Sequence, residues 1–194
     1  MEDVKYCLCC GENVPCNTFT RNERIEVTCV YCGFTLDVQT TWENKKPSDR
    51  EDGYALVTDD SKYTRKMIED LLTQRSFSAH ILSFENGLEL VSGYSKLLNE
   101  KKPVDIAIID LNMPVMDGLT AARLMRSVEA QHNTKKTPIV FFSAEKADDS
   151  LRRQMENLDP ANYVNKGSDP DPDKLASRIE SLIGYLMEKY KHRN

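Results

Sequence analysis

The sequence predicts an α/β protein with a five-stranded, parallel, doubly wound sheet, preceded by a small antiparallel module. Two observations lead to this prediction. From residue 53 onward, short apolar runs alternate with amphipathic helical patterns, which is the order of a parallel sheet covered by helices on both faces. All six cysteines, in contrast, fall within the first 32 residues. We therefore divide the chain into a cysteine module at 1–42, a charged linker at 43–52 and an α/β domain at 53–194.

Charge and hydropathy argue against two classes of protein. A net charge of −5 and a pI near 5.3 make the nucleic-acid backbone an unfavourable main partner. The acidic start lacks the apolar core of a signal peptide, and no apolar run has the length needed to cross a membrane. We therefore expect a cytoplasmic protein without a membrane partner.

The cysteines form two copies of the pattern C-x2-C-G. Cys7 and Cys10 make the first pair, Cys29 and Cys32 make the second, and 18 residues separate the pairs. In a reducing cytosol, clustered thiols at this spacing favour a tetrahedral Zn²⁺ site over disulfides. Four thiolates close the coordination shell and leave no position for a reactive water, so the predicted Zn²⁺ is structural.

The segments around the second pair predict antiparallel strands. Arg24–Thr28 and Phe34–Gln39 alternate apolar and polar residues, as half-exposed strands do. With its two cysteine pairs, the module resembles a zinc ribbon. Cys9 or Cys16 could replace one of the four predicted ligands, and their surplus also raises the hypothesis of thiol redox sensing.

Apolar patterns define each element of the α/β domain. Strands are predicted at Ala55–Thr58, His80–Phe84, Ile106–Ile109, Pro138–Phe142 and Asn162–Asn165. Helices are predicted from apolar stripes that begin at Met67, Leu90, Leu119, Leu151 and Leu175. The last stripe runs to Tyr190 and predicts a long final helix.

Reactive side chains follow four of the five predicted strands. These are Asp59 and Asp60, then Asp110, then Ser143, then Lys166. Parallel strands end at one edge of a sheet, and ligands bind at that edge. Carboxylates can hold Mg²⁺, and one of them can attack phosphorus. A lysine and a hydroxyl can neutralise charge on the transferred oxygens. The pattern therefore predicts phosphoryl-transfer chemistry.

Four motifs carry a family resemblance. The sequences DDS at Asp59, IIDLNMPVMDG around Asp110, FFSA at Ser143 and YVNK at Lys166 resemble the receiver domain of bacterial two-component response regulators. The resemblance covers residues 54 to about 188. It implies that Asp110 accepts a phosphoryl group from a phosphohistidine on a separate sensor histidine kinase or phosphotransfer protein.

The resemblance also implies roles for the neighbouring residues. Mg²⁺ would be held by Asp60, Asp110 and the backbone carbonyl of Asn112, with Asp59 acting through water. Lys166 would pair with the phosphoryl group.

Two further residues would act as the switch. Ser143 takes the place of the switch hydroxyl and Tyr163 that of the switch aromatic, and both bias the face made by the fourth helix, fifth strand and fifth helix of the receiver. Two departures affect this face. Gly167 follows the lysine where the family has proline, and Leu158–Ala161 replaces a small Gly-Ala turn.

The sequence predicts no separate output domain after the receiver. Our first hypothesis is a phosphorylation-switched response regulator, not an enzyme beyond its own phosphorylation and dephosphorylation, that changes its contacts with a downstream protein. The apolar final helix raises the hypothesis of a homodimer, although the stripe could equally be core. The alternative is a transcription regulator whose zinc ribbon binds nucleic acid; it ranks second because residues 1–40 carry three basic and six acidic side chains.

Overall fold

The computed structural model describes residues 4–21, 24–32, 34, 36, 52–74, 78–144, 148–166, 177–179 and 181. The predicted linker at 43–52, apart from Asp52, lies outside this part of the chain, as does Gly167. Most of the predicted final helix also lies outside it, and the residues described there, 177–179 and 181, are helical.

The N-terminal sheet has three antiparallel strands. These are β1 (Val4–Cys7), β2 (Glu12–Arg21) and β3 (Arg24–Cys29), with β2 in the centre. β3 coincides with the strand predicted at Arg24–Thr28, whereas β1 and β2 were not predicted. Phe34 and Leu36 lie outside any strand, so the strand predicted at Phe34–Gln39 is wrong at its described residues, although both still bond to the backbone of β3.

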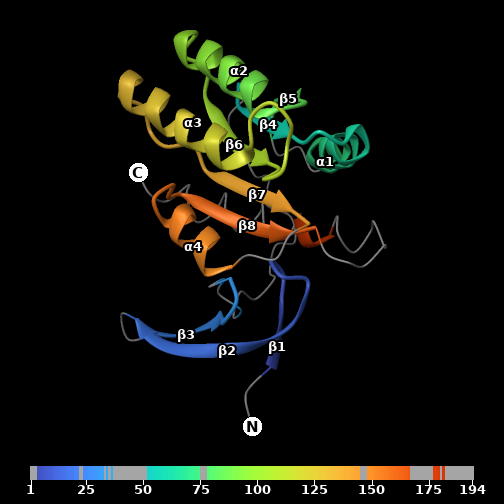
Figure 1. The fold of residues 1–194 in the computed structure, drawn as a ribbon, viewed down its shortest axis with the longest axis vertical. Coiled ribbons are helices and arrows are strands. Elements are labelled where there is room, and N and C mark those ends of the chain that lie inside the picture. The colour runs from blue at the N-terminus through green and yellow to red at the C-terminus, as the bar shows by residue number, and fades with distance from the viewer. Residues whose placement is uncertain are drawn as a thin grey trace.

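The α/β domain contains one five-stranded parallel sheet in the order β5-β4-β6-β7-β8 (Figure 1). Its strands are β4 (Tyr54–Thr58), β5 (His80–Phe84), β6 (Val104–Ile109), β7 (Ile139–Ser143) and β8 (Ala161–Asn165). Each predicted strand is present, and the parallel, doubly wound arrangement is confirmed. All five carboxyl ends therefore meet at one edge.

Four helices of this domain are described, and they cover the two faces of the sheet. They are α1 (Lys62–Gln74), α2 (Gly87–Asn99), α3 (Gly118–His132) and α4 (Asp149–Glu156). In Figure 1, α2 and α3 lie side by side on one face while α1 lies on the other. Asn86, Asp117 and Asp148 begin α2, α3 and α4 as N-caps, because each side chain accepts a backbone N–H of the first turn. None of the described helices has the length and apolarity to cross a membrane.

An apolar core lies on each face of the parallel sheet. β4 illustrates the alternation, since Ala55 and Val57 join one buried cluster whereas Leu56 joins the other. The first cluster extends into the N-terminal module, where Cys7 and Val14 are also fully buried. The two parts of the chain are therefore packed against each other, and of the five parallel strands β8 lies nearest the N-terminal sheet (Figure 1).

Candidate functional site

Three carboxylates meet at the carboxyl edge of the parallel sheet. Asp59 and Asp60 follow β4, and Asp110 follows the neighbouring β6. One oxygen from each lies within 4.8 Å of the others; Asp59 and Asp110 are buried and Asp60 is exposed. The Asp110 backbone N–H donates to the Thr58 carbonyl at 2.8 Å and so joins the ends of the two strands. The cluster offers the oxygen ligands that Mg²⁺ prefers.

Lys166 reaches this cluster from the end of β8. Its Nζ donates to Asp59 Oδ2 at 2.7 Å and to Asp110 Oδ2 at 2.9 Å, although Asp59 lies 107 positions away in the sequence. The backbone N–H of Lys166 donates to the Ser143 carbonyl at 2.7 Å, so the end of β7 positions the lysine. Nζ also lies 5.3 Å from the centre of the Phe142 ring, within cation–π range.

The charges of this cluster favour a further cation. Burial raises the pKa of Asp59, and the hydrogen bond from Lys166 offsets only part of that effect. Although burial acts to lower the pKa of Lys166, its bonds to Asp59 and Asp110 raise that pKa above the usual value. The lysine is therefore charged, but it supplies one positive charge against three carboxylates. A divalent cation would balance the remainder.

The loop after β6 folds closely over Asp110. A Cβ on Gly118 would lie 2.1 Å from the Asp110 carbonyl oxygen, so α3 can begin this close to the strand end only with glycine. The Gly118 N–H donates to the Leu111 carbonyl at 2.9 Å. The exposed Asn112 lies within this loop, and its N–H is 3.5 Å from Asp110 Oδ1. The loop therefore brings the backbone of Asn112 to the carboxylate cluster.

The two predicted switch residues are both buried. Ser143 ends β7, the strand between β6 and β8, and its exposed fraction is 1%. Tyr163 lies within β8 with an exposed fraction of 5%, and its hydroxyl accepts a hydrogen bond from Asn165 Nδ2 at 3.0 Å. Tyr163 is thus buried in this structure, and its hydroxyl is hydrogen-bonded.

Arg65 is a site residue that the sequence reasoning missed. It lies in α1 and is buried, and its Nη1 donates to the Asp59 carbonyl at 2.7 Å. Its Nη2 bonds Glu85 Oε1 at 2.7 Å, so its charge is paired away from the three carboxylates. A signal was present in the sequence, because Arg65 precedes Ile68 by three residues and so lies on the buried stripe of α1.

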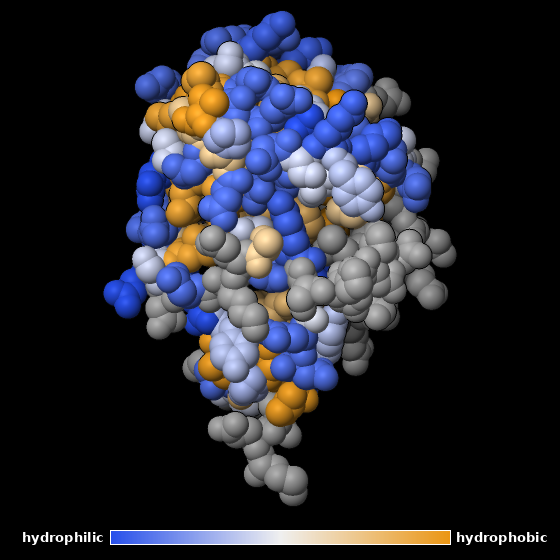
Figure 2. Space-filling view, turned by 45° about the vertical axis from the view of Figure 1, so that its right-hand side comes forward, coloured by the Kyte–Doolittle hydropathy of each residue, from blue (hydrophilic) through white to orange (hydrophobic). Residues whose placement is uncertain are grey.

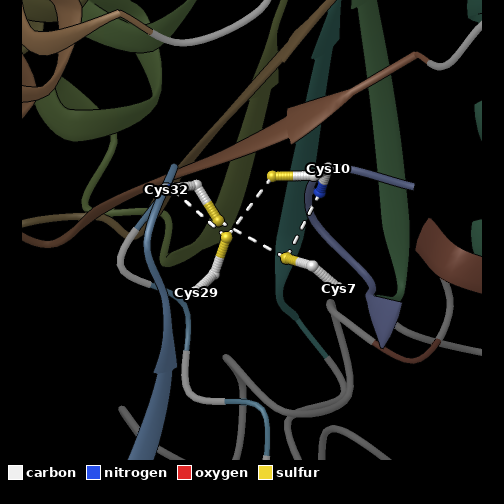
Figure 3. Close-up of side chains that lie close together, drawn as sticks. All are labelled: Cys7, Cys10, Cys29 and Cys32. Carbon is white, nitrogen blue, oxygen red and sulfur yellow. Dashed lines mark hydrogen bonds between the residues drawn. The ribbon is translucent and has the colours of Figure 1, made fainter. Parts of the chain in front are cut away.

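The second candidate site is the cysteine cluster of the N-terminal module. Figure 3 shows Cys7, Cys10, Cys29 and Cys32 with their sulfurs turned toward one another. The Cys7 and Cys32 sulfurs are 3.5 Å apart, those of Cys10 and Cys29 are 3.7 Å apart, and all four lie within 4.8 Å. The Cys10 N–H points at the Cys7 sulfur and the Cys32 N–H at the Cys29 sulfur, each at 3.4 Å. Two equivalent knuckles therefore face each other.

This sulfur cluster fits a tetrahedral Zn²⁺ site. Thiolates at about 2.3 Å from Zn²⁺ stand about 3.8 Å apart in a tetrahedron, close to the two measured separations. Hydrogen bonds from Cys10 and Cys32 hold the pKa of Cys7 far below its usual value, while the bonds that Cys10 makes with Cys32 and Cys7 raise its own pKa. A bound Zn²⁺ would favour the thiolate form of its ligands. Cys9 is not one of the four grouped sulfurs, although its thiol hydrogen-bonds those of Cys32 and Cys7. Burial raises the pKa of the Cys9 thiol, which opposes the thiolate that redox chemistry requires.

The fold and the strand-end site define a class of α/β proteins that bind their ligands at the carboxyl edge of a parallel sheet. A family model, described as the response regulator receiver domain, matches residues 55–180. This match covers well over half of the 194 residues, and the chain belongs to the response regulator receiver family. The match begins after the cysteine module.

Individual proteins with similar sequences are consistent with this family assignment. The chain is 36% identical over 76 residues to the chemotaxis protein CheY of Bacillus subtilis, which is 39% of this chain and 58% of CheY. It is 37% identical over 136 residues to a protein-glutamate methylesterase/protein-glutamine glutaminase of Archaeoglobus fulgidus, which is 69% of this chain and 34% of that protein. The chain thus spans less than two thirds of these two curated relatives.

A solved structure shows the same fold. The receiver domain of the histidine kinase CKI1 from Arabidopsis thaliana, complexed with Mg²⁺ and BeF₃⁻, superimposes with a TM-score of 0.56 at 24% identity. The superposition covers 70% of this chain and 89% of that one.

Proposed function

We propose that this chain is a two-component response regulator that accepts a phosphoryl group on Asp110 from the phosphohistidine of a sensor histidine kinase or phosphotransfer protein. One observation carries the proposal: Lys166 Nζ bonds both Asp59 and Asp110 within a three-carboxylate cluster at the edge of a receiver sheet. Phosphorylation then changes the contacts of the chain with a downstream protein.

Asp60, Asp110 and the Asn112 carbonyl would hold Mg²⁺, with Asp59 contributing through water. Bound Mg²⁺ would balance the excess negative charge of the cluster, and the Mg²⁺ complex of the similar Arabidopsis domain supports Mg²⁺ as the ion. Asp59 is the more buried of the acidic pair, which suits an indirect contact.

In the transfer, an Asp110 carboxylate oxygen attacks phosphorus in line as the P–N bond to the donor histidine breaks. Lys166 is already 2.9 Å from Asp110 Oδ2 and would pair with the phosphoryl oxygens. The Ser143 hydroxyl would donate to them from the end of β7. Tyr163 would act as the switch aromatic that rotates inward on phosphorylation, and its side chain is buried in this structure.

Intact-mass spectrometry tests the phosphoacceptor. The wild-type chain is incubated with a small acyl-phosphate donor, with and without Mg²⁺. We expect one added phosphoryl group that requires Mg²⁺ and is absent in Asp110→Asn. Asp70→Asn is the matched control, because Asp70 is an exposed α1 residue paired with Lys66, outside the cluster. Equal labelling of Asp110→Asn would refute the assignment.

We further propose that Cys7, Cys10, Cys29 and Cys32 hold one structural Zn²⁺, which the sulfur separations support. Metal analysis of the purified chain is expected to find one Zn²⁺ per chain in the wild type and a strong loss in Cys29→Ser. Cys16→Ser is the cysteine control outside the cluster, and equal Zn²⁺ loss in both variants would contradict the ligand set.

The surface around the phosphorylation edge suits a protein partner. On the face drawn in Figure 2 the surface is mainly hydrophilic, and several of its apolar groups lie along the left side of the upper part of the molecule. Of the seven large apolar residues that are exposed in the described part of the chain, three lie at this edge: Tyr63 at the start of α1, Leu88 at the start of α2 and Val115 in the loop after β6. Tyr63→Ser with Val115→Ser should slow transfer from a kinase but leave labelling by the small donor unchanged.

At its described residues, the final helix packs into the core of this chain, which favours the core interpretation of its apolar stripe over a dimer contact. Arg178 and Ile179 are both buried within this chain. A homodimer remains a hypothesis that light scattering of the phosphorylated chain would decide. Binding of duplex DNA at low salt would favour the alternative of a nucleic-acid regulator.

A further inference from the structure

The first cysteine knuckle, residues 7–11, lies against the outer strand of the receiver sheet. β8 is the last strand in the sheet order. The backbone N–H of Asn165, at its carboxyl end, donates to the Cys9 carbonyl at 2.7 Å. The knuckle thus satisfies a polar group of an edge strand that would otherwise be open to solvent or to another chain. Asn165 directly precedes Lys166, so this contact lies one residue from the phosphorylation site.

Arg178 holds the knuckle and β8 together. Its Nε donates to the Leu8 carbonyl at 2.8 Å, and its Nη2 donates to the Cys9 carbonyl at 3.1 Å and the Asn165 carbonyl at 2.9 Å. The exposed fraction of Arg178 is 7%, so these bonds form out of water. Breaking them would leave a buried charge without its acceptors, which is costly.

Gly11 makes this close approach possible. Its φ of +74° belongs to the left-handed region, and a Cβ there would lie 2.5 Å from the Arg178 Cζ. The glycine that ends the first cysteine pair therefore has a second role beyond the metal turn: it allows the guanidinium to lie on the knuckle backbone.

The contact continues along β8 to the predicted switch residue. A cavity of about 350 Å³ beside it is lined by Cys10 and Cys32 from the cysteine cluster and by Tyr163 and Asn165 from β8. The Asn165 side chain also bonds the Tyr163 hydroxyl at 3.0 Å. One residue, Asn165, thus touches the knuckle through its backbone and the switch aromatic through its side chain.

We propose that the knuckle 7–11 is the in-chain partner of the receiver's outer strand, and that metal binding by the cysteines thereby fixes the Lys166 end of the phosphorylation site. The inference rests on the proposed function for the identity of both sites. Metal loading matters for two reasons. A small module of this kind loses its order without its metal, and four thiolates around Zn²⁺ carry a net negative charge that attracts Arg178.

Amide hydrogen exchange followed by mass spectrometry tests this docking directly. The full chain is compared with and without a nitrogen-donor chelator that takes Zn²⁺ but leaves excess Mg²⁺ in solution. We expect exchange in the β8 segment 161–166 to rise by at least about fivefold when Zn²⁺ is removed, because the Asn165 N–H loses its acceptor. Exchange in β4 and β6, which lie inside the sheet, should stay unchanged.

Variants separate docking from metal binding. Arg178→Met keeps the apolar length of the side chain and should raise β8 exchange while the chain retains its Zn²⁺. Arg123→Met is the matched control, since Arg123 is exposed on α3 and bonds Gln154. Arg178→Lys should restore part of the protection. Unchanged β8 exchange after both Zn²⁺ removal and Arg178→Met overturns the inference.

Labelling of Asp110 by the acyl-phosphate donor is measured on the same samples. We expect the labelled fraction to fall at least about threefold without Zn²⁺, since Lys166 is then less well positioned. An unchanged fraction beside faster β8 exchange overturns the coupling to the phosphorylation site. If the Zn²⁺-loaded wild type takes no phosphoryl group, the proposed function fails, while the exchange comparison still decides the docking.

Discussion

The proposed phosphorylation site and the cysteine cluster are assembled in opposite ways. The first gathers side chains from the ends of β4, β6 and β8, which are far apart in the chain, on a sheet with an apolar core on each face. The second gathers four side chains within residues 7–32, on a three-stranded sheet of its own. A large core can hold a site in place before its ligand arrives, whereas a small module depends on the metal itself.

Removal of Zn²⁺ should have the largest effect on structure, because it should unfold the N-terminal sheet and leave the parallel sheet folded. Because structural Zn²⁺ contributes on the order of 10 kcal/mol to the folding of small modules, we expect the N-terminal sheet to lose its exchange protection entirely. The parallel sheet should keep a cooperative thermal transition, recorded by circular dichroism. Cys16→Ser should keep the protection. A protected N-terminal sheet in the metal-free chain would show that packing alone holds it.

A substitution remote from both sites tests the strength of the larger core. Glu129 is buried in α3, where it bonds Arg126, the Tyr94 hydroxyl and the Thr137 backbone N–H. Glu129→Ala leaves the Arg126 charge unpaired and should cost about 3 to 5 kcal/mol of unfolding free energy in urea titration. The exposed Glu100→Ala should change it by less than about 0.5 kcal/mol.

The loop over Asp110 is the next most sensitive point. Gly118→Ala places a Cβ against the Asp110 carbonyl, and the backbone must move to relieve the contact. We expect about 2 kcal/mol lower stability and a clear fall in phosphoryl labelling. Ser127→Ala, at an exposed position of the same helix, is the control. A Gly118→Ala chain with wild-type labelling would show that the loop tolerates displacement.

The smallest effect concerns pH. Burial raises the pKa of Asp59, so the folded state holds this proton more tightly than the unfolded state. The resulting stability is present below the ordinary carboxyl value of 3.8 and is lost as pH rises through the raised pKa. Without Mg²⁺, the free energy of unfolding of Asp59→Asn in urea titration should therefore be larger than that of the wild type by on the order of 1 kcal/mol at neutral pH. This difference should shrink as the pH falls toward 3.8. A difference that widens on acidification would contradict this.

Most of the proposed phosphorylation site was predictable, because each strand end is marked by residues that are adjacent in the sequence. A short apolar run followed by a carboxylate, hydroxyl or amine marks a strand end, and parallel strands bring their ends together. This reasoning placed Asp59, Asp110 and Lys166 at one edge. The geometry leaves the roles themselves open, so the roles assigned by resemblance stay predictions for every site residue: Asp59, Asp60, Asp110, Asn112, Ser143, Tyr163 and Lys166.

The N-terminal module was predictable in its cysteines more than in its strands. Paired spacing alone grouped the four sulfurs, since each pair is a local turn. β2 escaped prediction because Pro15 and polar residues interrupt its alternation, and its pairing with β1 and β3 decides its conformation. Arg65 escaped because its partners are backbone carbonyls and a glutamate 20 residues away.

The sequence by itself thus determined the parallel fold, the strand-end carboxylates and the two cysteine knuckles, because each depends on periodicity or short spacing. Only the tertiary structure decided where the cysteine module sits. The bonds from Asn165 and Arg178 to the Leu8 and Cys9 carbonyls join positions 156 to 170 residues apart, and the acceptors are backbone atoms, which every residue carries. No side-chain pattern records such contacts, so the link between the two sites is a property of the folded chain.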